Sequence, residues 1–316
     1  MYHIGIDLGG TKIAGGLITS EGDLLVKKSI PTLRNRDVKE ILKDIIDLAL
    51  ELIDKRADIA SIGVGVPGPV EPNTGEVIKC INLGWAKIPL KEILENALQI
   101  KVSVGNDATL AGLAELKVGA MKNAKSGVML TLGTGIGGAV VLDGKIISGY
   151  NGIASEFGHM KVGEGFYNCN CGKNGCLETF SSGTALIKYT RKLIEDEIIT
   201  DSILMKESDN NLDKLNAYLI FEAAKKGDKA ALKAVDRMAE YLGIGIINIV
   251  SVIDPEIIVI GGGVSQAGDF LLNRIKKAAL SHRFYKEIPI GDIVPAQLGN
   301  DAGIIGAGLY SFFEAV

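Results

Sequence analysis

The chain has 316 residues, which is long enough for two domains at about 150 residues each. Its 34 basic and 38 acidic residues leave a net charge of −4, so we expect no broad cationic face for nucleic acid or for an anionic membrane. The longest apolar run, residues 242–253, is too short to cross a bilayer, and the first residues lack the pattern of a signal peptide. These features favour a soluble cytoplasmic protein whose partners are small molecules.

Two stretches of the chain follow the same plan of strand, glycine-rich turn and strand. In the first, strands at 3–7 and 13–19 flank the turn LGGTK, and in the second, residues 126–142 contain the turn GTGIGG. Gly9 of the first stretch aligns with Gly133 of the second. This repeat predicts two related half-molecules, each of which presents backbone N–H groups to a phosphate.

The turn GTGIGG also fits the dinucleotide-binding pattern GxGxxG. That pattern requires a helix to begin at the turn, whereas the following residues, AVVLDGKII, read as a second strand. A tight hairpin without a ligand would explain a single turn of this kind. Two copies, with Thr11 and Thr134 beside the glycines, favour phosphate contact instead.

The segment between the repeats alternates helix and strand. Residues 37–55 carry apolar side chains at helical spacing and predict an amphipathic helix. Residues 61–70 predict a buried strand that ends in a Gly-Pro turn. Trp85, the only tryptophan, is expected to be a packing residue.

Residues 100–115 predict a strand that leads into an alanine-rich helix. Asn106 and Asp107 lie at the junction, where either residue type is a common helix N-cap. A carboxylate at the end of a parallel strand is equally where an α/β fold places catalytic groups. The residues alone leave both interpretations open.

Three of the four cysteines gather around one histidine in the middle of the chain. Thiolates and a neutral imidazole are ligands that tetrahedral zinc prefers, and two glycines would let the backbone fold tightly between them. The alternative is a set of ordinary reduced thiols, but such crowding favours a metal. The predicted ligands are His159, Cys169, Cys171 and Cys176. Two carboxylates, Glu156 and Glu178, flank them in the sequence.

The rest of the chain reads as helices around one further strand. Residues 201–214 are rich in charge and predict a solvated surface segment, and residues 230–253 predict a long helix. A buried strand then runs into three glycines at 261–263, with a helix expected from near Gln266, which is a third place where a nucleotide could lie against backbone. Residues 301–313 predict a tightly packed helix of small residues.

Taken in chain order, eight motifs make the sequence similar to the ROK family of sugar kinases and regulators, with the zinc-containing glucokinases as its nearest branch. The motifs are DLGGTK, GVPGPV, NLGW, GNDA, LGTGIGG, EFGH, CxCGxxGCLE and DPEIIVIGGG. The resemblance implies an actin-like, ribonuclease-H-like α/β ATPase fold with two domains around a cleft for nucleotide and sugar. It places residues 1–116 with 301–316 in the first domain and residues 117–300 in the second.

The resemblance also implies roles for individual residues. It implies that Asp7 lies near the Mg²⁺-bound phosphates of ATP, that Asp107 is the catalytic base, and that the zinc is structural because three thiolates and an imidazole fill its four positions. The implied phosphate and adenosine contacts are Gly9, Gly10, Thr11, Lys12, Thr134, Gly135, Gly137, Gly261, Gly262 and Gly263. The implied sugar contacts are Gly68, Asn106, Asp107, Glu156, His159 and Glu178.

The implied reaction is ATP-dependent phosphorylation of a hexose at its 6-hydroxyl, with glucose as the first candidate. N-acetylmannosamine, N-acetylglucosamine, fructose and allose stay open as substrates. A sugar-responsive regulator of the same family is disfavoured, because such regulators carry a helix-turn-helix module ahead of the kinase-like part and here the first strand begins at His3. By analogy with the family we expect a homodimer or a larger homo-oligomer.

Overall fold

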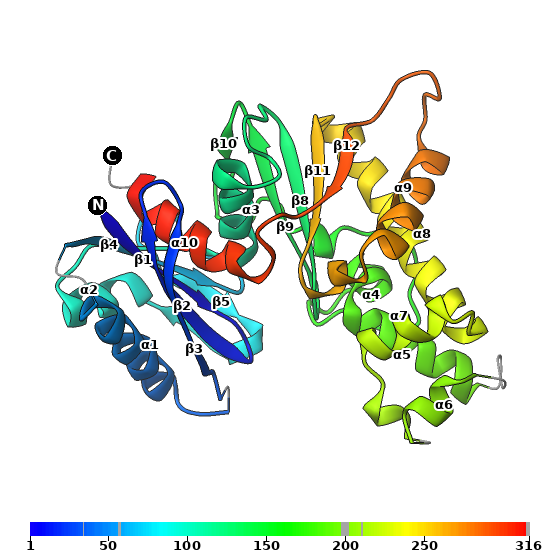
Figure 1. The fold of residues 1–316 in the computed structure, drawn as a ribbon, viewed down its shortest axis with the longest axis horizontal. Helices are drawn as coiled ribbons and strands as arrows, with labels where there is room; N and C mark the ends of the chain where they lie inside the picture. Colours follow the sequence, from blue (N-terminus) through cyan, green and yellow to red (C-terminus); the bar gives the residue numbers. More distant parts are fainter. Residues whose placement is uncertain (34, 56–57, 197–201, 210, 314–316) are drawn as a thin grey trace. The chain divides into compact units, whose positions relative to one another are not determined.

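The computed structural model describes residues 1–33, 35–55, 58–196, 202–209 and 211–313. The chain forms two compact units (Figure 1). The first unit comprises residues 1–125, 139–155 and 297–316, and the second comprises residues 126–138 and 156–296. Residues 117–125, 139–155 and 297–300 thus belong to the first compact unit, whereas the resemblance assigned them to the second domain.

The first unit is built on a five-stranded sheet in the order β3-β2-β1-β4-β7. Neighbouring strands are antiparallel from β3 to β1 and parallel from β1 to β7. The strands are β1 (Tyr2–Leu8), β2 (Lys12–Thr19), β3 (Leu24–Pro31), β4 (Ile59–Val66) and β7 (Val102–Asn106). Besides the sheet, this part of the chain holds a small hairpin of β5 (Val77–Cys80) and β6 (Trp85–Ile88), joined by η1 (Ile81–Leu83).

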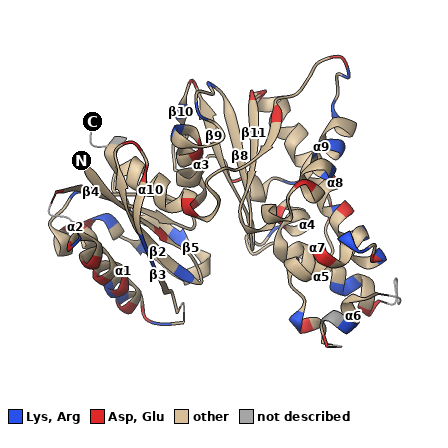
Figure 2. Ribbon diagram, in the orientation of Figure 1, with Lys and Arg blue, Asp and Glu red and all other residues tan. Residues whose placement is uncertain are grey.

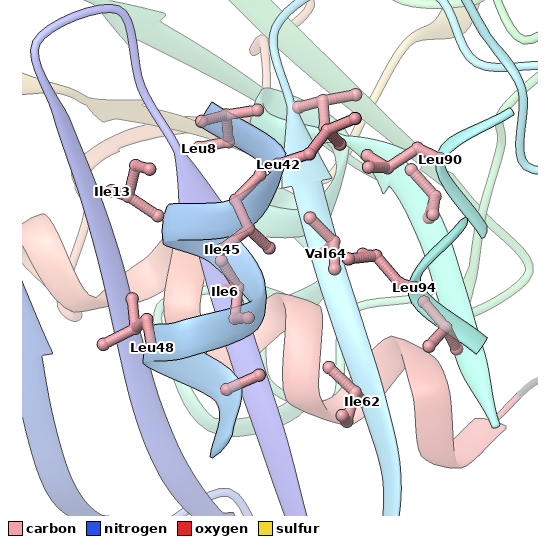
Figure 3. Packing of buried hydrophobic residues seen from close by; sticks show 14 of the residues in the cluster. Ile6, Leu8, Ile13, Leu42, Ile45, Leu48, Ile62, Val64, Leu90 and Leu94 are labelled. Atoms are coloured by element: carbon pink, nitrogen blue, oxygen red, sulfur yellow. The ribbon is translucent and has the colours of Figure 1, made fainter. Parts of the chain in front are cut away.

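One face of this sheet is covered by α1 (Val38–Ile53) and α2 (Leu90–Leu98), and Figure 3 shows the apolar side chains between them. The predicted amphipathic helix is confirmed as α1, whose Ile45 and Leu48 are buried against strand residues such as Ile6. Its first turn is closed by a capping box in which Asp37 accepts a hydrogen bond from Lys39 N at 2.8 Å. Trp85 is only 2% exposed within the same core, so its predicted packing role is confirmed.

The other face of the sheet is covered by α10 (Ala302–Phe313), which also packs on α3 (Asp107–Val118). Glycines on the strands let the helix approach very closely. A Cβ on Gly5 would lie 1.9 Å from Ile304 O, and a Cβ on Gly63 would lie 1.7 Å from Ala307 O. Because no side chain fits at these strand positions, the helix backbone lies directly on β1 and β4. Residues 314–316 lie outside the described part of the chain.

A second five-stranded sheet has the order β10-β9-β8-β11-β12. In both sheets the strands follow the same order, third-second-first-fourth-fifth, when they are numbered along the chain within each sheet. The predicted repeat of a glycine-tipped hairpin is therefore confirmed and extends to whole sheets. The boundary between the two compact units falls within β9. The strands are β8 (Gly127–Leu132), β9 (Ile136–Leu142), β10 (Lys145–Ile146), β11 (Ile257–Gly261) and β12 (Asp292–Pro295).

Besides these strands, the described part of the second unit contains a loop that carries the cysteines, residues 160–177, and several helices. The long predicted helix is α8, and it packs along α9, where a Cβ on Gly243 would lie 2.6 Å from the Cβ of Ala278. The helices are α4 (Glu178–Ser181), α5 (Gly183–Glu195), α6 (Leu204–Glu207), α7 (Ala217–Lys225), α8 (Lys229–Ile253) and α9 (Asp269–His282), with short 3-10 turns η2 (Phe157–His159), η3 (Leu212–Lys214), η4 (Gly263–Ala267) and, in the first unit, η5 (Gly299–Asp301).

Two expectations for the second unit were wrong in detail. The segment 201–214 is not wholly solvated, because Leu204 in α6 is fully buried and Ile203 N donates to the Asp228 carboxylate at 2.8 Å. Residues 197–201 and 210 lie outside the described part of the chain. The α-helix expected near Gln266 begins at Asp269, after the 3-10 turn η4.

Charges of both signs are interspersed along the helices. In Figure 2, Lys and Arg alternate with Asp and Glu on α1 and on the helices of the second unit. Such mixing agrees with the small net charge and with the expectation of small-molecule partners. Of the helices that the structure describes, none combines the length and apolar character needed to cross a membrane.

Candidate functional site

The first predicted phosphate loop is the turn between β1 and β2. Gly9 N donates to Lys12 O at 2.9 Å and closes the turn. Thr32, just after β3, holds the turn from outside: its hydroxyl donates to Gly9 O at 2.6 Å and its N–H to Thr11 O at 3.0 Å. These bonds use the carbonyl groups of the turn, and they leave Gly10 and Thr11 at its partly exposed tip.

Asp7 precedes this loop on β1, and its carboxylate lies against the first turn of α10. A Cβ on Gly303 would lie 2.8 Å from Asp7 Oδ2. Burial raises the pKa of Asp7, and the charge of Lys12 opposes that effect. The structure thus brings together the predicted metal-associated carboxylate, the first loop and the N-terminus of α10.

Asn106 and Asp107 take different positions at the start of α3. Asn106 is the N-cap: its Oδ1 accepts from Thr109 N at 3.0 Å, while its Nδ2 donates to Gly68 O at 3.2 Å. Asp107 is the first helical residue, and its Oδ1 accepts from Ala108 N at 2.8 Å. The capping role and the predicted carboxylate role therefore fall on neighbouring residues, Asn106 and Asp107.

Gly68 lies in the turn after β4 with a φ of 102°, a backbone conformation that favours glycine. A Cβ at this position would lie 2.3 Å from Lys79 O, so the turn is packed directly against β5. The neighbouring Cys80 is buried, which raises the pKa of its thiol to about 11, with a smaller contribution from the Asp107 charge. The predicted sugar contacts of the first unit, Gly68, Asn106 and Asp107, are thus contiguous.

In the second unit, the second predicted phosphate loop lies beside Glu178. Gly133 N donates to Gly135 O at 3.0 Å, and Gly183 N at the start of α5 donates to Gly133 O at 2.8 Å. A Cβ on Gly135 would lie 2.7 Å from Glu178 Oε2. The second predicted phosphate loop is therefore a neighbour of Glu178, a predicted sugar carboxylate. Thr134 and Gly137 belong to the same loop.

The three glycines after β11 lie next to the same loop. Gly262 has a φ of 83°, and a Cβ on it would lie 2.5 Å from Leu132 O, the last residue of β8. Gly261 ends β11 and Gly263 begins η4. Gly133 and Gly262, which directly follow β8 and β11, therefore lie at two neighbouring strand ends that are packed against each other.

The four predicted metal ligands form a single cluster. Their donor atoms all lie within 4.8 Å of one another. Cys171 Sγ is 3.6 Å from Cys176 Sγ, and Cys169 Sγ is 3.6 Å from His159 Nδ1. A tetrahedral zinc with bonds of about 2.3 Å to sulfur and about 2.0 Å to nitrogen requires separations of about 3.8 Å between two sulfurs and about 3.5 Å between sulfur and nitrogen, so the residues fit that ion.

The side chains around the cluster show how it meets the predicted sugar contacts. His159 directs Nδ1 to the cysteines, and its Nε2 lies 4.0 Å from Glu156 Oε2. The Cys169 thiol donates to Glu178 Oε1 at 2.8 Å. Burial raises the pKa of Glu156, the charge of His159 opposes this, and that of Glu178 adds to it.

Some residues that support these groups carried no recognisable signal in the sequence. Thr32, Gly303 and Glu115 are examples, and Glu115 is fully buried with its carboxylate accepting from Ala120 N, Gln297 N and Leu298 N at 2.7 to 3.0 Å. Gly303 lies in the predicted helix of small residues, so close packing was foreseeable there. Its contact with Asp7, nearly three hundred positions away, was not.

Comparisons with known proteins agree with these motifs. The profile of the ROK family matches residues 3–311. The chain is 40% identical to the glucokinase of Halalkalibacterium halodurans, over 97% of this chain and 94% of that protein. A crystal structure of a ROK family glucokinase from Streptomyces griseus in complex with glucose and AMPPNP superposes with a TM-score of 0.89 at 32% identity, over 99% of this chain and 100% of that one. A xylose repressor of Caldicellulosiruptor bescii is 29% identical over 96% of this chain and 76% of that protein.

Proposed function

Because this chain belongs to the ROK family of actin-like sugar kinases, we propose that it transfers the γ-phosphoryl group of ATP to the 6-hydroxyl of glucose. The observation that carries this proposal is the near full-length similarity to glucokinases, one of which was crystallised with glucose and an ATP analogue. The proposed division into domains follows the resemblance, with residues 1–116 and 301–316 in one and 117–300 in the other.

Phosphoryl transfer leaves little covalent work for the protein, so positioning and charge neutralisation dominate the catalysis. We assign the backbone N–H groups of the two glycine turns to the phosphates of ATP. The glycines after β11 are assigned to its adenosine. Asp7 would hold Mg²⁺, which when bound neutralises charge on the transferred group.

Asp107 is assigned as the base that accepts the proton of the sugar hydroxyl. Its place directly after β7 supports this role, because an α/β fold places catalytic carboxylates at the ends of parallel strands. Asn106 retains one amide N–H beyond its bond to Gly68 O, and that N–H can donate to a sugar hydroxyl.

Glu156, His159 and Glu178 are assigned to the sugar hydroxyls on the second unit. Carboxylates accept hydrogen bonds from hydroxyl groups, and the Nε2 of His159 faces away from the cysteines toward Glu156. A zinc ion held by His159, Cys169, Cys171 and Cys176 would fix the tautomer of that imidazole and hold the two ends of residues 156–178 together. Elemental analysis is expected to find one zinc per chain.

A coupled assay of glucose phosphorylation tests the proposal. Asp107→Asn is expected to lower kcat by about 10²- to 10⁴-fold, the usual contribution of a general base. Asp37→Asn is the matched control, because Asp37 also begins a helix but lies in an exposed cap with no assigned chemistry. Wild-type turnover in the Asp107→Asn variant would overturn the base assignment.

The same assay decides the substrate. Glucose is expected to show a higher kcat/KM than N-acetylglucosamine, N-acetylmannosamine, fructose or allose. A higher value for an N-acetylated sugar would move the proposal to that substrate and keep the enzyme class. Salt-dependent binding of duplex DNA in place of turnover would favour the regulator instead, the class to which the similar xylose repressor belongs.

A further inference from the structure

A half-buried arginine lies at the centre of an aromatic cluster in the second unit. The guanidinium carbon of Arg237, on α8, is 4.3 Å from the ring centre of Tyr189, 4.7 Å from that of Phe180 and 5.1 Å from that of Tyr241. Phe166 is a fourth ring, at 5.9 Å. These rings come from α4, α5, α8 and the loop between His159 and Cys169, so one cation contacts four separate segments.

The aromatic cluster is attached to α4, the short helix that begins with Glu178. Phe180 is two residues after Glu178 in a helix of four residues, and Arg237 donates to Phe180 O at 3.4 Å. Ser181, in the same short helix, donates to Met238 O on α8 at 2.9 Å. With so short a helix, its direction is set by these attachments to α8 rather than by its own hydrogen bonds.

The cluster also supports the loop that carries the cysteines. The rings of Phe180 and Tyr241 stack with centres 4.0 Å apart, and the loop backbone lies on them. A Cβ on Gly163 would lie 3.3 Å from the Tyr241 ring, and one on Gly165 would lie 3.5 Å from the Phe180 ring. Movement of these rings would therefore move both Glu178 and the cysteine loop.

We propose that Arg237 is a positioning residue for the sugar site. Through Phe180 and Phe166 it holds Glu178 and the loop that carries the cysteines in their relative positions. The proposal rests on the assignment of Glu178 to the sugar. It assigns Arg237 no contact with substrate and no step in the chemistry. Its function is to fix the direction of a carboxylate that lies beside the second phosphate loop.

Kinetics and zinc release together test this role. Arg237→Met keeps a long unbranched side chain but removes the charge and the hydrogen bond to Phe180 O. It is expected to raise KM for glucose by about 10-fold, the loss of a partly desolvated cation–π contact, with KM for ATP unchanged. Zinc release to a chromogenic chelator is expected to be about 10-fold faster. Arg237→Lys keeps the cation without the planar fork and is expected to give intermediate values for both.

Arg274→Met is the matched control. Arg274, on α9, also packs on an aromatic ring, that of Phe270 at 3.8 Å, and its guanidinium binds Asp236 and Phe270 O, partners on α8 and α9 rather than on α4 or the cysteine loop. It is expected to lower the melting temperature without changing KM for glucose or the rate of zinc release. Equal effects of the Arg237 and Arg274 variants on all readouts would overturn the proposal.

Two further outcomes have a definite meaning. If Arg237→Met does not fold, the Lys variant decides, and wild-type KM and zinc release in that variant would contradict the positioning role. If the wild-type protein does not phosphorylate glucose, the proposed function fails. Zinc release then still shows whether Arg237 holds the loop, because that measurement needs no substrate.

Discussion

The contact between Gly303 and Asp7 allows a prediction that separates stability from activity. Gly303 lies in the first turn of α10, where alanine would ordinarily stabilise a helix by up to about 1 kcal/mol relative to glycine. Here the added Cβ would lie 2.8 Å from both Cγ and Oδ2 of Asp7, whereas unstrained carbon contacts lie at about 3.5 to 4.0 Å. Gly303→Ala must therefore displace the carboxylate by about 1 Å or shift the helix.

The two effects oppose each other, and their sizes determine the expected sign. Overpacking of this kind costs about 1 to 3 kcal/mol, which equals or exceeds the gain in helix propensity. Gly303→Ala is thus expected to leave the wild-type background unchanged or less stable by up to about 2 kcal/mol. In an Asp7→Ala background the clash is absent, so the same change is expected to stabilise the protein by up to about 1 kcal/mol.

A double-mutant cycle measured by urea unfolding tests this reasoning without reference to function. The expected coupling between the two positions is about 1 to 3 kcal/mol. Equal stabilisation by Gly303→Ala in both backgrounds would refute the steric argument. Under the proposed function, the displaced carboxylate should also lower kcat/KM by about 10²-fold, as misplacement of a catalytic group by about 1 Å does.

Two further predictions concern buried polar groups. Glu115→Ala removes a fully buried carboxylate that accepts from three partly buried N–H groups, and it is expected to cost about 3 kcal/mol or more in urea unfolding. The control Glu95→Ala, whose carboxylate accepts a single bond from Val102 N, is expected to cost about 1 kcal/mol. Equal costs would show that the three bonds at Glu115 add nothing. Burial lowers the pKa of His3, and the charge of the N-terminal amine adds to this effect. The unfolded state therefore binds the proton more readily than the folded state, so stability is expected to fall as the pH drops below about 6.5. Urea unfolding at several pH values should show this slope in the wild type and a shallower slope in His3→Gln, and identical slopes would contradict the assignment.

Local patterns in the sequence determined much of the fold. The apolar spacing of residues 37–55 was enough to predict α1, because a helix that packs on a sheet repeats its buried side chains every three to four positions. The two glycine turns, each between apolar runs, predicted the repeated hairpins. The solvated reading of residues 201–214 was wrong because Leu204 is buried and Ile203 N binds Asp228, a residue 25 positions away. The helix start near Gln266 was wrong because the local bonds of η4, from Ser265 and Gly268, occupy that position first.

The cluster of His159 with Cys169, Cys171 and Cys176 was predictable for a similar reason. Its four ligands lie within 18 consecutive residues, so their spacing alone constrains them to approach one another. The spacing could not say which imidazole nitrogen faces the cysteines. Only the packed loop shows that Nδ1 does and that Nε2 lies toward Glu156.

The type of each element and the chemistry of each short motif could be predicted, because they depend on residues close together in the chain. The distant residues that support them became visible only in the folded protein. Gly303 faces Asp7, Glu115 binds the backbone of Gln297, and Arg237 lies among the rings beside Glu178. Such contacts join positions far apart in the chain and have no period or spacing, since they arise only when packed elements bring the side chains together.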